Sequence, residues 1–366
     1  MSEAPASKAP LTIWSDPRVQ EHQSSGYHPE RPSRLDAALR GARDVAKEVH
    51  GREQMLLYAA SRAAIARAHD EAYLDRLDAA EAKGARVQLD PDTYFGPGSL
   101  EAATLAAGGA IAMVESLMAD QTAVGMLLAR PPGHHATRER AMGFCLLNNI
   151  AIGALHARAA GARRVAIVDW DVHHGNGTQN IFWRDPAVLF ISLHQAPLYP
   201  DSGWVNEIGE GEGLGSTINL PFPAAGDGQL YAAAFERVVL PVLEEAQPDL
   251  ILVSAGYDGH ARDPLASMLL RDSDFGWMAA RLREASLRLC AGRIGFCLEG
   301  GYDVGAVEAS VAATLRGALD PAAHPTPATD ASPPAASRIV DGVVRAVAPR
   351  WRCLRDDASG RTISVA

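Results

Sequence analysis

The chain has 366 residues, of which 47% are apolar and 21% charged, a balance typical of globular proteins and unlike that of collagenous, coiled-coil or wholly disordered chains. Its 34 basic side chains are outnumbered by 44 acidic ones, which gives a net charge of −10. Because no basic run is present, this balance argues against binding of DNA or RNA. The longest largely apolar run, Ala102–Val114, is shorter than the roughly 20 residues that a membrane-spanning helix needs.

The first ten residues lack the basic and apolar regions of a signal peptide, so we expect a cytoplasmic protein. No CxxC pair occurs, and in a reducing compartment the cysteines are expected to be buried thiols rather than disulfides. They are Cys145, Cys290, Cys297 and Cys353.

Short apolar runs alternate along the chain with longer stretches of helical periodicity. In chain order, the predicted strands are Ala123–Ala129, Arg164–Trp170, Ala187–Leu193, Ser216–Leu220, Asp249–Ala255 and Arg293–Leu298. The predicted helices are Leu100–Met118, Leu146–Ala160, Gln229–Ala246, Asp272–Leu289 and Val304–Leu319. Strands that are apolar on both faces and alternate with helices favour a central parallel sheet covered by helices on both faces. We therefore predict a single-domain α/β fold.

Composition changes outside this alternating region. Residues 1–10 and 320–337 are rich in Pro, Ala and Ser and are predicted to be a disordered tail and a linker. Residues 11–319 form the predicted domain between them. The remaining residues, 338–366, are too few to fold alone, and we expect them to dock on the domain.

A polar loop follows each of five predicted strands at its C-terminal end. In chain order these loops read RPPGHH, DVHHGNG, HQ, GYD and GGYD. In open parallel α/β sheets, ligands bind at this edge of the sheet. We therefore expect the polar clusters to meet at one site.

Two of these loops carry adjacent histidine pairs, His134–His135 and His173–His174. A single histidine is by default a packed or solvated residue. The rigid turn formed by Pro131-Pro132-Gly133, however, would hold the first pair in fixed directions. The pairs are therefore candidate functional residues.

The second loop places Asp169, Asp171 and His173 at a spacing of two, so in an extended segment the three side chains share one face. Buried carboxylates at a strand end are costly unless they are paired or bind a metal ion, and three such ligands suit a divalent metal. The alternative is a pair of aspartates that cap the following helix.

Two further loops offer partners for this cluster. Asp258 lies in a Gly-Tyr-Asp turn, which is common turn chemistry, but with Asp171 and His173 it would complete a set of three ligands with open positions, as in catalytic metal sites. Tyr302 follows two glycines; it is by default a packing residue, but the glycines would let it swing towards a ligand.

Taken together, the motifs RPPGHHA, MGFCLLNN, DWDVHHGNGTQ, ISLH, SAGYD, EGGY and HPERPSR resemble those of the zinc-dependent histone deacetylase family. The chain is most similar to its class II-like bacterial members, the histone deacetylase-like and acetylpolyamine amidohydrolases. The likeness runs from about residue 24 to residue 319. It implies an arginase–deacetylase fold with one catalytic zinc.

The resemblance also implies roles for individual residues. The implied zinc ligands are Asp171, His173 and Asp258. His134 and His135 match the tandem histidines, with Asp169 and Asn176 as their respective hydrogen-bond partners. Tyr302 matches the tyrosine that stabilises the transition state. Residues that match the walls and rim of the acyl-lysine tunnel are Gly143, Phe144, Tyr199 and Leu265.

The implied reaction is hydrolysis of an amide by metal-activated water, with His135 as general base and Tyr302 as a donor to the oxyanion. An Asp/His/Asp ligand set also tolerates Fe²⁺ or Co²⁺. The family often holds structural K⁺ as well, here near the backbone of Asp169–His173 and Ser192–Leu193.

The expected substrate is an acyl-lysine side chain in a peptide or protein. Polyamine-selective relatives carry Glu at the rim position that Leu265 occupies here. N-acetylpolyamines are the alternative, with Glu21, Glu30, Asp92 or an oligomer partner supplying the acidic group. A protein that binds acyl groups without hydrolysing them, or an arginase-like dinuclear enzyme, fits the motifs less well.

Overall fold

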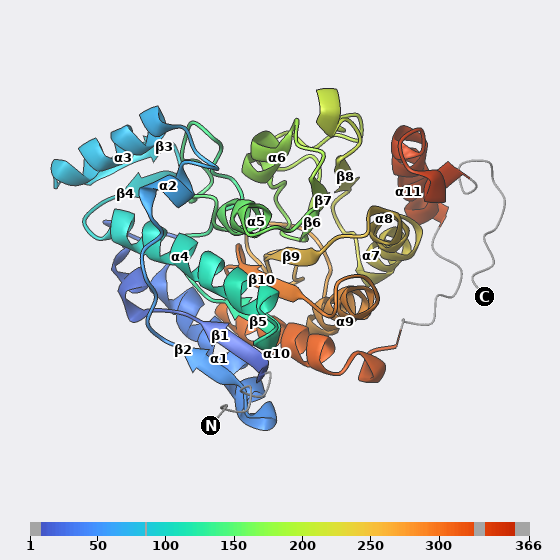
Figure 1. The fold of residues 1–366 in the computed structure, drawn as a ribbon, viewed down its shortest axis with the longest axis horizontal. Coiled ribbons are helices and arrows are strands. Elements are labelled where there is room, and N and C mark those ends of the chain that lie inside the picture. Colours follow the sequence, from blue (N-terminus) through green and yellow to red (C-terminus); the bar gives the residue numbers. More distant parts are fainter. Residues whose placement is uncertain (1–8, 85, 326–333, 356–366) are drawn as a thin grey trace.

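The computed structural model describes residues 9–84, 86–325 and 334–355, and its centre is an eight-stranded sheet (Figure 1). All neighbouring strands are parallel, in the order β2-β1-β5-β10-β9-β6-β7-β8. The strands are β1 (Ala9–Trp14), β2 (Arg52–Gln54), β5 (Thr122–Leu127), β6 (Val165–Asp169), β7 (Val188–Gln195), β8 (Thr217–Phe222), β9 (Leu250–Ala255) and β10 (Ile294–Leu298). Every residue of β6, β7, β9 and β10 is buried, as expected of strands covered on both faces.

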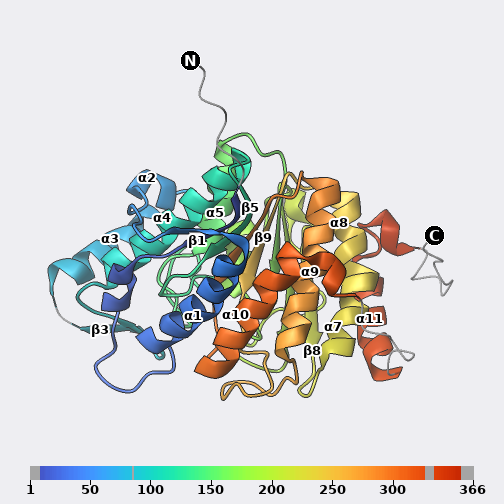
Figure 2. The ribbon, with the colours of Figure 1, turned by 90° about the horizontal axis from the view of Figure 1, so that it is seen from below.

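Helices cover both faces of the sheet (Figures 1 and 2). One layer contains α1 (Pro32–Val49), α10 (Val304–Leu319), α9 (Asp272–Leu289), α7 (Gly228–Ala234) and α8 (Leu240–Ala246). The other contains α4 (Ser99–Met118), α5 (Asn149–Ala159) and α6 (Asn176–Phe182). Glycines let helices approach closely: a Cβ on Gly317 of α10 would lie 2.0 Å from the carbonyl oxygen of Gly276 in α9. The predicted parallel α/β architecture is confirmed.

All six predicted strands and all five predicted helical segments are present, with ends shifted by at most three residues. One helical segment is not continuous. Between α7 and α8 lies a π-helical turn, Phe235–Val239, where the sequence predicted an unbroken helix. Pro241, in the first turn of α8, has no N–H to continue the α-helical ladder, which accounts for the interruption.

The N-terminal elements had no counterpart among the predicted strands and helices. Besides β1, β2 and α1, they are α2 (Arg62–Ile65), α3 (Glu71–Ala82) and an antiparallel hairpin of β3 (Val87–Asp90) and β4 (Thr93–Phe95). β1 begins at Ala9, inside the stretch predicted to be a disordered tail, because pairing with β2 and β5 buries it in the sheet. Residues 1–8 of that tail lie outside the described residues.

The described part of the C-terminal segment packs on the domain. α11 (Pro334–Val347) begins inside the predicted linker and contacts α7 and β8. Its valines at helical spacing are buried: Val340, Val343, Val344 and Val347. Beyond the helix, the Trp351 indole donates a 2.9 Å hydrogen bond to the carbonyl of Gly215. Residues 326–333 and 356–366 of the predicted linker and segment lie outside the described residues.

α4 is long and apolar enough to cross a membrane by length and composition. However, 61% of its most apolar window is buried inside the protein, where it packs on β5 and α5. Core helices of this kind meet the same length and composition criteria. The four cysteines are free thiols, and Cys353 alone among them is only half-buried.

Candidate active site

The candidate site lies at the carboxyl ends of four neighbouring strands. β5, β10, β9 and β6 are adjacent in the sheet, so the loops that follow them emerge side by side. The tandem histidines follow β5, the Glu299–Tyr302 segment follows β10, and Asp258 follows β9. The Asp169–His173 segment begins at the last residue of β6. The sheet order therefore brings together clusters that are far apart in the sequence.

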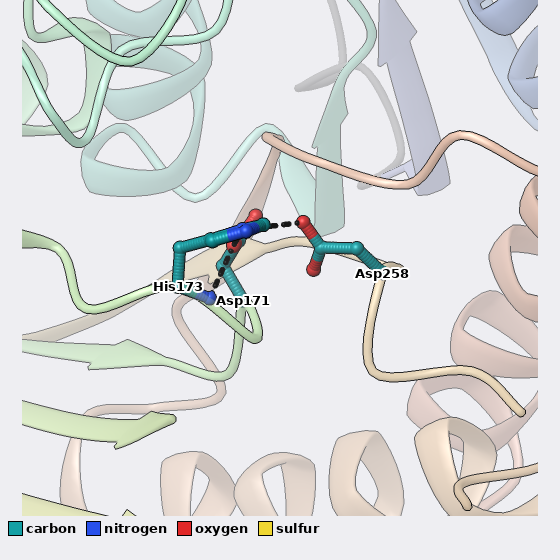
Figure 3. A group of neighbouring side chains, drawn as sticks. All are labelled: Asp171, His173 and Asp258. Carbon is teal, nitrogen blue, oxygen red and sulfur yellow. Dashed lines mark hydrogen bonds and ion pairs between the residues drawn. The ribbon is translucent and has the colours of Figure 1, made fainter. Parts of the chain in front are cut away.

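Asp171, His173 and Asp258 form a compact buried cluster whose potential ligand atoms all lie within 4.8 Å of one another (Figure 3). The His173 Nδ1 atom is 3.3 Å from Asp171 Oδ1 and 3.1 Å from Asp258 Oδ2. It thus lies between the two carboxylates, as three ligands around a common point would.

Backbone groups hold both carboxylates in place. Asp258 Oδ1 accepts a 2.9 Å hydrogen bond from the Val172 N–H, and Asp171 Oδ2 accepts one of 2.7 Å from the Gly300 N–H. Each carboxylate keeps its other oxygen on the His173 side. A Cβ on Gly300 would lie 2.1 Å from Asp258 Oδ2, and one on Gly256 would lie 2.0 Å from Asp171 Oδ2. Only glycine leaves room for the carboxylates at these two positions.

The charge of this cluster fits a bound cation. Burial alone would lower the pKa of His173, but hydrogen bonds and charge from Asp171 and Asp258 outweigh burial and raise that pKa to about 10. The pair of buried carboxylates therefore requires a positive charge, supplied by a proton on His173 or by a metal ion in its place. Three donors of the Asp/His/Asp type suit a divalent metal and leave coordination positions open.

His134 is held from two sides. Its Nδ1 lies 3.0 Å from Asp169 Oδ2, and its backbone N–H donates to Glu299 Oε2, which also accepts from the Gly133 N–H at 2.6 Å. Burial opposes its protonation, but the charges of Asp169 and Asp171 raise the pKa of His134 to about 10. His134 and Asp169 thus form a buried ion pair.

His135 is in the opposite electrostatic state. Burial, together with the nearby His134 and His173, lowers its pKa well below the ordinary value. Its Nδ1 lies 2.7 Å from Asn176 Oδ1, and because that oxygen only accepts, Nδ1 carries the proton. The Nε2 atom of a neutral His135 is therefore free to accept a proton.

Tyr302 is buried on the loop after β10. Its ring packs edge-on against Phe144 at 5.8 Å between centroids, and the Arg34 guanidinium lies 4.8 Å from its ring centre. Arg34 also donates to the carbonyls of Gly301 and Glu299. Burial raises the pKa of Tyr302 well above its ordinary value, so the hydroxyl stays protonated.

The residues predicted to line the tunnel lie around these groups. The Tyr199 ring meets His135 edge-on at 5.2 Å. Gly143 has a positive φ of 57°, and a Cβ there would lie 2.3 Å from the His135 ring, so the position requires glycine. The Gly143 N–H donates to Asp92, which places that carboxylate at the rim.

Leu265 is half-buried on the loop after β9. Its N–H donates a 3.0 Å hydrogen bond to Asp263 Oδ1, and the other oxygen of that carboxylate accepts from the Tyr302 N–H at 2.6 Å. Leu265 is thus joined to the site through Asp263.

Of the acidic residues predicted as candidates for polyamine recognition, Glu30 cannot serve, and that prediction is wrong. It is fully buried, and its carboxylate is bound by Arg130 and by Arg34, the latter at 3.1 Å. A carboxylate that two guanidinium groups already neutralise has no capacity left for an ammonium ion. Glu21 is exposed, and Asp92 lies at the rim.

Sequence reasoning missed the supporting parts played by Glu30, Arg34, Arg130 and Asp263. The four-residue spacing of Glu30 and Arg34 inside HPERPSR was the available signal, since oppositely charged side chains at that spacing can pair, here with Glu30 just before α1 and Arg34 in its first turn. Nothing in the sequence links Glu30 to Arg130, which is 100 residues away.

Comparisons with known proteins agree with this fold and identify the family. The sequence-family model of the histone deacetylase domain matches residues 28–318 of this chain. A histone deacetylase-like amidohydrolase of Pseudomonas aeruginosa is 44% identical over 238 residues, covering 64% of this chain and 62% of that protein. The human polyamine deacetylase HDAC10 is 35% identical over 361 residues, covering 94% of this chain and 51% of that protein. The crystal structure of the HDA15 HD domain matches with a TM-score of 0.88 and 32% identity, covering 96% of this chain and 98% of that one.

The parallel sheet, its two helix layers and the buried Asp/His/Asp cluster define an α/β protein of the arginase–deacetylase fold. The chain belongs to the histone deacetylase family, a family of amide-bond hydrolases. It spans less than two thirds of the length of both curated relatives.

Proposed function

We propose that this chain is a metal-dependent deacetylase that removes acetyl or other short acyl groups from acyl-lysine side chains of peptides or proteins. The observation that carries the proposal is the meeting of three elements at one sheet edge: the Asp171/His173/Asp258 cluster, a neutral His135 and a protonated Tyr302. Amide hydrolysis needs a polarised carbonyl, a base for water and a donor to the oxyanion, and these groups supply all three.

Zn²⁺ is the ion we propose for the Asp171/His173/Asp258 cluster, with Fe²⁺ and Co²⁺ as compatible alternatives. When bound there, the ion supplies Lewis acidity and lowers the pKa of water in its open positions towards neutrality. The two carboxylates and the neutral imidazole would hold it, and the backbone contacts to Val172 and Gly300 keep the carboxylates in place.

The chain's own groups then divide the proton transfers. His135 accepts the proton from water at Nε2, because Asn176 keeps its Nδ1 protonated. The proton that His135 has accepted passes to the leaving lysine amine as the C–N bond breaks, and His134, held by Asp169, lies beside His135. The Tyr302 hydroxyl donates a hydrogen bond to the oxyanion of the tetrahedral state.

The walls support an acyl-lysine substrate. Phe144 and Tyr199 pack beside Tyr302 and His135, respectively, and their rings suit the apolar methylene chain of lysine. Leu265 at the rim is uncharged and favours a peptide-flanked lysine over a free polyamine.

N-acetylpolyamines are the second candidate, because two carboxylates lie near the rim. Asp92 binds the Gly143 N–H, and its charge, added to burial, raises the pKa of the neighbouring Asp90. Burial and, after it, the charges of both carboxylates raise the pKa of Tyr199 in the proposed tunnel wall. A cationic substrate would be attracted to this pair.

The test compares the rates of zinc-loaded protein on an acetyl-lysine peptide and on N-acetylputrescine. We expect faster hydrolysis of the peptide, and Tyr302→Phe serves as the control for contaminating activity. Faster hydrolysis of N-acetylputrescine would favour the second candidate. Failure to hydrolyse either would favour a protein that binds acyl groups without cleaving them.

A further inference from the structure

One buried carboxylate connects the rim of the site to the segment that carries Tyr302. Asp263 is 7% exposed. Its Oδ1 accepts the Leu265 N–H at 3.0 Å, and its Oδ2 accepts the Tyr302 N–H at 2.6 Å and the Asp303 N–H at 3.4 Å. Asp263 itself lies on the loop after β9, so its Oδ1 makes a local contact two residues further along that loop, while its Oδ2 reaches across to the loop after β10.

The segment before Tyr302 needs such a restraint. Tyr302 follows Gly300 and Gly301, and Gly301 has a φ of +112°, so the backbone on this side has unusual freedom. Arg34 holds the Gly301 carbonyl, and Asp303 caps α10 by accepting the Ala306 N–H at 2.7 Å. The Tyr302 N–H itself is bound by Asp263.

Within the loop after β9, the same carboxylate fixes the backbone of the rim residue Leu265 two positions further on. The Leu265 N–H donates a 3.0 Å hydrogen bond to Asp263 Oδ1. The nearby ion pair of Arg262 with Asp303, at 3.6 Å, joins the same two loops, but its partners are exposed and such pairs contribute little. Asp263 is therefore the buried link between the rim and Tyr302.

We infer that Asp263 is a positioning residue that sets Leu265 and Tyr302 relative to each other, so that substrate selection and turnover are coupled. This inference rests on the proposed function for its kinetic consequences. A displaced rim changes which substrate enters, and a displaced hydroxyl weakens its hydrogen bond to the oxyanion. A single change at Asp263 should therefore alter both properties, whereas changes at Leu265 or Tyr302 alter one each.

The kinetic test measures kcat and KM for an acetyl-lysine peptide and for N-acetylputrescine. Asp263→Asn leaves one acceptor oxygen for two loops; we expect kcat on the peptide to fall about 10- to 100-fold, the scale of a small misplacement in an active site. The ratio of kcat/KM for the peptide to kcat/KM for N-acetylputrescine should change by at least about threefold in Asp263→Asn. The change should have the same direction as the change that Leu265→Ala causes. Leu265→Ala should shift this ratio with a much smaller fall in kcat than Asp263→Asn causes, and Tyr302→Phe should lower kcat while leaving the ratio nearly unchanged.

Asp249→Asn is the matched control. Asp249 also accepts two backbone N–H groups, those of Arg163 and Arg164 at 2.7 and 3.1 Å, but it precedes β9 and lies at the opposite edge of the sheet. It should change neither kcat nor the substrate ratio. Bound zinc and thermal unfolding are measured for every variant, and Asp263→Ser is prepared in case the amide is not tolerated.

Hydrogen exchange of the amides provides a readout that does not depend on activity. In Asp263→Asn or Asp263→Ser, the backbone amide hydrogens of both segments, the one with Leu265 and the one with Tyr302, should exchange roughly tenfold faster than in the wild type. In Asp249→Asn their exchange rates should stay at the wild-type values. Loss of kcat without a shift in substrate ratio, or faster exchange in one loop alone, would overturn the coupling. A wild-type protein inactive on both substrates would refute the proposed function, while the exchange data would still decide the positioning role.

Discussion

Two buried ionic clusters lie near each other in this molecule and differ in charge balance. In the first, one carboxylate, Glu30, faces the guanidinium groups of Arg130 and Arg34. Burial favours the neutral acid, but the two guanidiniums outweigh burial and lower the pKa of Glu30 to about 2. In the second, two carboxylates, Asp171 and Asp258, share one imidazole. In the first cluster the protein supplies more positive charge than the carboxylate needs, whereas in the second a single imidazole faces two carboxylates, and a bound cation would balance them.

This difference separates a structural cluster from a functional one. A buried charge that the chain already balances can stabilise the fold, whereas a charge left unbalanced is costly unless a ligand completes it. The clusters are also connected, since Arg34 donates to Glu30 and to the carbonyls of Glu299 and Gly301 beside Tyr302.

The largest effect is expected at the unbalanced cluster. Asp258→Ala should abolish zinc binding and deacetylation, because two remaining ligands cannot hold the ion against solvent. Metal content by mass spectrometry and the rate on an acetyl-lysine peptide measure the two effects, with Asp249→Ala as control. Stoichiometric zinc in the Asp258 variant would show that the ligand set is wrong.

Breaking the Glu30 cluster should lower the stability of the fold. Glu30→Gln leaves Arg130 and Arg34 buried without a carboxylate, and breaking a buried ion pair in this way costs about 3–5 kcal/mol in the free energy of unfolding. Urea denaturation monitored by tryptophan fluorescence measures the change. A loss below about 1 kcal/mol would mean that the cluster does not stabilise the fold.

Tyr302→Phe tests the site without disturbing either cluster. Loss of one donor to the oxyanion should lower kcat about 10²–10³-fold, while bound zinc stays stoichiometric. Steady-state kinetics of metal-loaded protein give the first value, and metal analysis gives the second. Full activity would remove the hydroxyl from the reaction.

The pH dependence of stability should distinguish the balanced cluster. The pKa of Glu30 is about 2 in the folded protein and 4.5 when unperturbed. Its ionised carboxylate therefore contributes fully to the free energy of unfolding above about pH 4.5, and this contribution is lost as the pH falls towards 2. The difference corresponds to about 3 kcal/mol. The gap in unfolding free energy between wild type and Glu30→Gln should therefore narrow over that range. A gap that stays constant would show that Glu30 does not titrate there.

The sequence indicated the sheet and the metal cluster because both depend on local pattern. Alternating apolar runs and helices predict a parallel sheet, and the spacing of Asp171 and His173 places both on one side of an extended segment. The pairing of Glu30 with Arg130 joins residues 100 apart, which no local pattern specifies. Asp263 was equally hidden, because it binds backbone N–H groups that almost any residue would provide.

The smallest predicted effect tests the connection between the clusters. Arg34→Lys keeps the positive charge beside Glu30, but a single ammonium group cannot replace the fork that also binds the Gly301 and Glu299 carbonyls. We expect the free energy of unfolding to fall by about 1–2 kcal/mol and kcat to fall about tenfold, since the Tyr302 segment loses part of its support. Urea denaturation and steady-state kinetics measure both. Reduced stability with unchanged kcat would mean that the balanced cluster supports the fold alone and that the active site is positioned without it.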